Sequence, residues 1–178
     1  MTSLPPVLPE ITFARVERLG RLHGTCVTYV AGFFALIAAM AGDYVAAIVG
    51  LLVAGAGVVE HHGAALLRRG EARGVSWLAG SQLFLFASIA AYCVVRLKVP
   101  VQFPPLPESL RPMVEMSAAQ MKMSVADYQL FAYRLGLWLV LGLSVFYQGG
   151  LGWYYLSRRA RVEAALAEPA EPDESESE

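Results

Sequence analysis

The sequence predicts an all-α membrane protein whose four transmembrane helices form an up-down-up-down bundle. Hydrophobic residues make up 56% of the chain and charged residues only 16%, which is unlike ordinary soluble usage. The apolar residues gather into runs close to the ~20 residues with which a helix crosses a ~30 Å hydrocarbon layer. The predicted spans are residues 24–41, 44–62, 75–95 and 131–156.

The N-terminal segment 1–22 is predicted to lie in the cytoplasm or at the membrane surface. Its first ten residues hold three prolines and should be irregular, and residues 11–22 predict a short surface helix. The four-helix domain then covers residues 23–157. A cleaved signal peptide is the alternative for the first span, because arginines precede it and Ala39-Met40-Ala41 resembles a cleavage site. Its apolar run is longer than a usual signal core, which favours an uncleaved helix.

Small residues mark the predicted helix contacts. Ala41-Gly42-Asp43 is short enough only for a tight hairpin, so the first two spans should be antiparallel neighbours. Glycine and alanine let two helix backbones approach closely in a membrane. The predicted interface residues are Gly50, Ala54, Gly55, Gly57, Gly142 and Gly149.

Residues 96–130 form the one sizeable predicted loop. Five prolines make its first half extended, residues 113–123 predict a short helix, and Ser124 with Asp127 predicts a helix cap. After the last span, residues 158–178 become acidic and lack aromatic residues, which predicts a disordered tail.

The distribution of basic residues predicts the orientation, because cytoplasmic loops of membrane proteins carry more Lys and Arg. Nine of the 14 fall on the side that holds both termini: Arg15, Arg18, Arg21, Arg68, Arg69, Arg73, Arg158, Arg159 and Arg161. The other five are Arg96, Lys98, Arg111, Lys122 and Arg134. Both termini are therefore expected in the cytoplasm, with the 96–130 loop outside. None of these residues forms a basic stripe, so no nucleic-acid partner is expected.

Four methionines in the external loop, Met113, Met116, Met121 and Met123, are weak candidates for a copper site. Thioethers are soft ligands that select Cu(I). Three of the methionines would share one helix face, however, which is also the pattern of an amphipathic segment packed on the bundle. Packing is the favoured interpretation. The three histidines do not form two pairs of mid-membrane axial ligands, which argues against a two-haem cytochrome.

Polar residues of all four spans are predicted to share one depth in the cytoplasmic half of the membrane. The hairpin at Gly42 places residues that are equally far from it, such as His23 and His61, at the same level. An ionisable side chain costs free energy when it lies in the hydrocarbon layer. Such side chains are expected to face the interior of the helix bundle, and they are candidates for functional sites. Hydrogen bonds between the helices are the favoured role of this polar layer. The sharper hypothesis is a ligand or proton site that comprises His23, Glu60, His61, Gln82 and Gln148.

The expected function is non-enzymatic. No nucleophile–base set, nucleotide loop or metal-ligand cluster stands out. We expect an inner-membrane scaffold, complex subunit or oligomeric pore that acts through its helix faces, with lipid and further copies or subunits as partners. The alternative is a membrane-bound redox or metal-handling enzyme that uses copper or haem.

Overall fold

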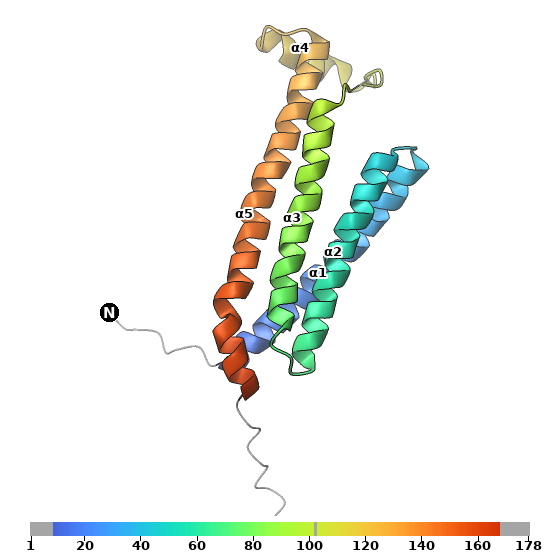
Figure 1. Cartoon of the computed structure of the whole chain (residues 1–178). Helices are drawn as coiled ribbons and strands as arrows, with labels where there is room; N and C mark the ends of the chain where they lie inside the picture. The colour runs from blue at the N-terminus through green and yellow to red at the C-terminus, as the bar shows by residue number, and fades with distance from the viewer. Residues whose placement is uncertain (1–8, 102, 168–178) are drawn as a thin grey trace, which may run out of the picture.

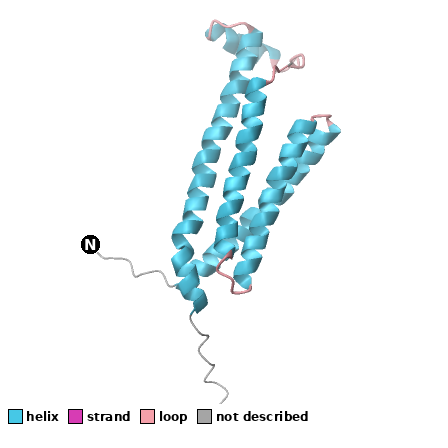
Figure 2. Ribbon diagram, in the orientation of Figure 1, coloured by secondary structure: helices cyan, strands magenta, loops and turns pink. Residues whose placement is uncertain are grey.

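The computed structural model describes residues 9–101 and 103–167, and in these ranges all regular structure is helical (Figure 2). The helices are α1 (Pro9–Met40), α2 (Tyr44–Arg68), α3 (Gly74–Lys98), α4 (Arg111–Gln120) and α5 (Val125–Ala167). Within these ranges four helices, α1, α2, α3 and α5, are long and apolar enough to cross a membrane. The prediction of an all-helical, multi-pass membrane protein is confirmed at this level. Residues 1–8 of the predicted irregular start and residues 168–178 of the predicted acidic tail lie outside the described residues. The prediction was wrong for Pro9 and Glu10, which form the first turn of α1, where proline is tolerated because its missing N–H has no partner in the helix.

Helix α1 is longer than the first predicted span. It runs without a break from Pro9 to Met40, so the predicted surface helix and the predicted span form one element. Gly20 and Gly24 lie inside this helix and are buried at contacts with other helices. A Cβ atom on Gly20 would lie 2.6 Å from a methyl group of Leu78, and one on Gly24 would lie 2.8 Å from the carbonyl oxygen of Gly57.

Helix α5 also extends beyond its predicted span at both ends. Ser124 caps its start as the sequence predicted, since its hydroxyl accepts the backbone N–H of Asp127 at 3.1 Å and donates to the Asp127 carboxylate at 2.7 Å. At the other end the helix continues to Ala167, through ten residues that were expected in the tail. The buried side chain of Val162 and the Arg159–Glu163 pair stabilise this extension.

The predicted hairpin between α1 and α2 is confirmed. Gly42 has a φ of +77°, which glycine adopts without strain, and the carboxylate of Asp43 accepts the N–H of Ala46 at 3.0 Å. The other oxygen of Asp43 pairs with the guanidinium of Arg96 near the end of α3. This ion pair links the α1–α2 hairpin to α3.

The main apolar core lies near the opposite end of α2. Side chains from all four long helices meet there: Val16, Leu67, Val75, Leu78, Ala79, Tyr155 and Val162. The helices converge at this end, whereas the α1–α2 pair leans away from the α3–α5 pair toward the 41–43 hairpin (Figure 1). Helix α4 lies beyond the far end of α5, in the connection between α3 and α5 (Figure 1). The convergent end is where the polar side chains are buried.

Candidate functional site: a buried carboxylate shared by three helices

Glu60 of α2 is the most deeply buried acidic residue among the described residues, with 1% of its surface exposed. It follows Asp43 by 17 residues, so it lies about 25 Å along the helix at 1.5 Å per residue. The backbones of α1 and α2 touch beside it at Gly24 and Gly57. This close approach is what brings side chains of α1 within reach of the carboxylate.

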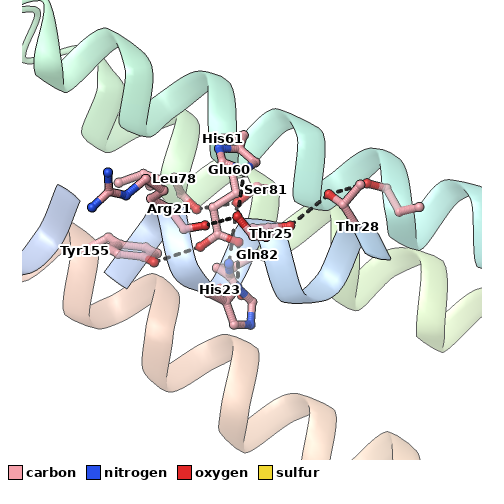
Figure 3. A network of polar contacts seen from close by, with 12 residues as sticks. Arg21, His23, Thr25, Thr28, Glu60, His61, Leu78, Ser81, Gln82 and Tyr155 are labelled. Atoms are coloured by element: carbon pink, nitrogen blue, oxygen red, sulfur yellow. Dashed lines mark hydrogen bonds and ion pairs between the residues drawn. The ribbon is translucent and has the colours of Figure 1, made fainter. Parts of the chain in front are cut away.

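Both oxygens of the Glu60 carboxylate are bonded by side chains of other helices (Figure 3). His23 of α1 places Nδ1 2.6 Å from Oε2, and the hydroxyl of Tyr155 on α5 donates to Oε1 at 2.7 Å. An ionised carboxylate only accepts hydrogen bonds, so His23 holds a proton on Nδ1 when Glu60 is charged. The three residues together satisfy a group that would be costly to bury alone.

A second contact joins α1 and α2 close to the first, between Thr25, two residues after His23, and His61, the residue after Glu60 (Figure 3). Thr25 Oγ1 donates its one hydrogen to the carbonyl of Arg21 at 2.8 Å. The same oxygen lies 2.8 Å from His61 Nε2, so this nitrogen must be the donor. His61 therefore carries a proton on Nε2, while the adjacent His62 is exposed and packs edge-on against Trp77 with ring centroids 5.1 Å apart.

Gln82 of α3 and Gln148 of α5 are buried but incompletely bonded. Their exposed fractions are 1% and 8%, and within the described part of the chain the Oε1 atom of each has no hydrogen-bond partner. The Nε2 atom of Gln82 lies 3.5 Å from Ser81 Oγ, a long hydrogen bond. Both glutamines line a narrow groove of about 210 Å³ between α3 and α5, together with Leu83, Phe86, Val145 and Gly149.

The structure thus joins His23 directly to Glu60, links His61 to the neighbouring Thr25, and leaves the two glutamines without direct bonds to this group. Tyr155 and Thr25 were absent from the site predicted from sequence. Tyr155 stands in a Trp-Tyr-Tyr sequence and resembles a residue of the membrane interface. The seven-residue spacing of positions 148, 155 and 162 is the signal that could have identified Tyr155 as buried. Residues at this spacing share one face of α5, and all three are buried.

The small residues predicted at helix interfaces fall into two groups. An added Cβ on Gly50 would lie 2.7 Å from the Cβ of Ala35, and one on Gly57 would lie 2.7 Å from the carbonyl oxygen of Gly24. Ala54 lies at the same α1–α2 contact, where its carbonyl oxygen is 3.4 Å from Thr28 Oγ1. In the second group no atom of the described residues lies within 4 Å of an added Cβ: Gly55, Gly142 and Gly149. Their role in a contact with another chain stays a prediction.

The described residues offer no conventional metal site, since no three His, Cys, Asp or Glu side chains gather closely enough to hold an ion. The four loop methionines are 40–59% exposed. Helix α4 ends at Gln120 and Lys122 adopts a φ of +54°, so Met121 and Met123 follow the helix instead of continuing the face of Met113 and Met116. The copper interpretation stays a prediction.

Comparison with known proteins adds no template for this arrangement. The chain matches no family model, no curated protein and no solved structure. Its function must therefore be argued from its own residues.

Proposed function

We propose that this chain is a non-enzymatic subunit of a membrane assembly, either a homo-oligomer or a larger complex, that associates through the face of α5 that carries Gly142 and Gly149 and borders the α3–α5 groove. It spans the inner (plasma) membrane in an up-down-up-down order with both termini in the cytoplasm. The excess of arginines near the convergent end supports this orientation.

The uncovered glycines of α5 carry the proposal. Gly142 and Gly149 are seven residues apart and so share one helix face, and nothing lies within 4 Å of an added Cβ on either. Phe146 and Trp153 each follow one of these glycines by four residues, and their side chains are 81% and 74% exposed. Glycine lowers helix stability by about 1 kcal/mol relative to alanine. A second helix packed closely on this face would offset that cost, as small-residue contacts do in membranes.

The test is the oligomeric state of the full chain in lipid nanodiscs or mild detergent. We expect a discrete oligomer or complex, and we expect Gly142→Leu with Gly149→Leu to shift it to smaller species. Gly32→Leu on α1 is the matched control, because an added Cβ there also meets nothing. A monomeric wild-type protein, or equal effects of the two changes, would refute association through α5.

A second candidate function is a proton-dependent change at the buried carboxylate, favoured by the direct contact of His23 with Glu60. An imidazole and a carboxylate at this distance share one proton, and such a pair is a common element of proton-transfer sites. Infrared difference spectroscopy between pH 5 and pH 8 tests this directly. We expect a carboxyl band that disappears in Glu60→Gln and persists in Glu115→Gln, an exposed residue of α4. Absence of a Glu60-dependent band rules out the proton role.

A further inference from the structure

Three basic residues surround a hollow at the end of the molecule opposite the Glu60 site. Arg96 and Lys98 close α3, and Arg134 lies on the neighbouring part of α5. With the chain segment 99–101 they enclose a volume of about 300 Å³, which Leu130 and Tyr133 also line. The hollow therefore combines basic side chains from both α3 and α5 with apolar residues of segment 99–101 and Leu130.

The positive charge of this hollow is mostly uncompensated. Among the described residues neither Lys98 nor Arg134 has an acidic group within ion-pair distance. Arg96 pairs with Asp43 through one terminal nitrogen, but its Nε atom is buried and has no hydrogen-bond partner in the described structure. A buried N–H donor without an acceptor is destabilising. A guanidinium group forms its strongest hydrogen bonds with carboxylate or phosphate oxygens.

A second groove, of about 310 Å³, continues from the hollow along α5. The two share Leu130 and Arg134, and the groove is completed by Asp127, Phe131, Leu135 and Trp138. Asp127 is bonded to Ser124 at the start of the helix. Leu135 and Trp138 are 46% and 60% exposed on a helix that can cross a membrane. Arg134 thus lies where a basic hollow meets an apolar surface.

We propose that this site binds an anionic phospholipid, with its phosphate among Arg96, Lys98 and Arg134 and one acyl chain along Leu135 and Trp138. The positive charges of these three side chains favour an anionic lipid over a zwitterionic one. A phosphate accepts hydrogen bonds from the guanidinium groups and offsets the excess positive charge, whereas the quaternary amine of a zwitterionic choline lipid would bring a further cation close to them. The apolar groove distinguishes a lipid from a soluble phosphate, which has nothing to place there.

Native mass spectrometry of the full chain, titrated with phosphatidylglycerol or phosphatidylcholine, tests the site. We expect tighter binding of phosphatidylglycerol, and at least tenfold weaker binding of that lipid to a Lys98→Gln, Arg134→Gln variant. Both side chains are exposed and neither forms an ion pair with another described residue, so the variant should keep the wild-type melting temperature. Arg158→Gln with Arg161→Gln, which removes the same charge at the other end of α5, is the matched control and should bind like the wild type.

Three results would overturn the proposal. Equal binding of the two lipids would exclude selection by the phosphate site. An equal loss in the control variant would indicate unspecific attraction between charges. Displacement of the lipid by equimolar glycerol 3-phosphate would show that the apolar groove contributes nothing and that the site takes soluble phosphates.

Discussion

The hydroxyl of Tyr155 donates a 2.7 Å hydrogen bond to the carboxylate of Glu60, a residue 95 positions earlier in the chain. The other oxygen of the same carboxylate contacts His23, 37 positions before Glu60. One buried acid therefore connects the first, second and last long helices. Because the apolar core surrounds Tyr155 at the same end, this connection fixes how the two helix pairs meet.

Removing the hydroxyl in Tyr155→Phe should destabilise the protein by about 1–3 kcal/mol, because it leaves a buried carboxylate oxygen without a donor. Thermal unfolding in a mild detergent measures the change. Tyr154→Phe is the matched control, since this neighbouring ring is only half-buried and its hydroxyl has no hydrogen bond to an acidic group among the described residues. Equal melting temperatures for the two variants would contradict the role assigned to Tyr155.

The contact between Gly24 and Gly57 should tolerate no side chain. Gly57→Ala brings a Cβ to 2.7 Å from the carbonyl oxygen of Gly24, and we expect a loss of about 1–3 kcal/mol from overpacking. Gly55→Ala, two residues away, meets nothing within 4 Å and should be neutral or stabilising by up to about 1 kcal/mol. Denaturation of both variants in the same detergent compares them. A stable Gly57→Ala variant would mean that α1 and α2 lie farther apart.

The charge of Asp43 should make stability depend on pH under acid conditions. The backbone N–H of Ala46, followed by the guanidinium of Arg96, holds the pKa of this carboxyl below its ordinary value of 3.8. A lowered pKa in the folded state stabilises the protein fully above the ordinary pKa, and this contribution is lost as pH falls through the lowered pKa.

Asp43→Asn isolates this effect, because asparagine still caps a helix but carries no charge. We expect the wild type to be more stable than the variant at neutral pH by less than about 1 kcal/mol, since Asp43 is 41% exposed at its side chain. The difference should decrease as the pH falls below about 3.8 and be lost once the pH falls through the lowered pKa of the folded state. Melting curves between pH 3 and pH 7 provide the measurement. A difference that stays constant over this range would assign the stabilisation to something other than the charge.

Gln82 should be replaceable by an apolar side chain of similar shape. Its Oε1 atom is buried without a partner in the described structure, so Gln82→Met should leave stability unchanged or raise it by about 1–3 kcal/mol. Gln120→Met at the exposed end of α4 controls for the change in composition. Clear destabilisation by Gln82→Met alone, seen in thermal unfolding, would show that the amide has a partner such as water.

Hydropathy was enough to predict the spans, because length and apolar composition alone decide whether a helix can cross a membrane. The depth of the polar residues could also be reasoned from the hairpin. His23 and His61 are each 19 positions from Gly42, and the structure bonds His23 to Glu60 and His61 to Thr25, both near that level.

The direction in which each side chain points could not be predicted. It depends on how the helices rotate against one another, and no residue count fixes that rotation. The aromatic run at the end of the last span shows the difficulty: Trp153 is 74% exposed and Tyr155 is fully buried, although hydropathy treats both as interface residues. The length of α5 was missed for a related reason, since Val162 is held by tertiary packing on the core and not by membrane hydropathy.

The shared carboxylate also has a consequence for biosynthesis. A ribosome completes α2, with Glu60, long before it completes the part of α5 that carries Tyr155. In that interval the carboxylate of Glu60 lacks its hydrogen bond from Tyr155, and of the two side chains that bond it in the described structure His23 alone has been made. The last helix to leave the ribosome therefore supplies the second hydrogen bond to the carboxylate of α2, and a chain truncated before Tyr155 should keep one oxygen of Glu60 without this donor.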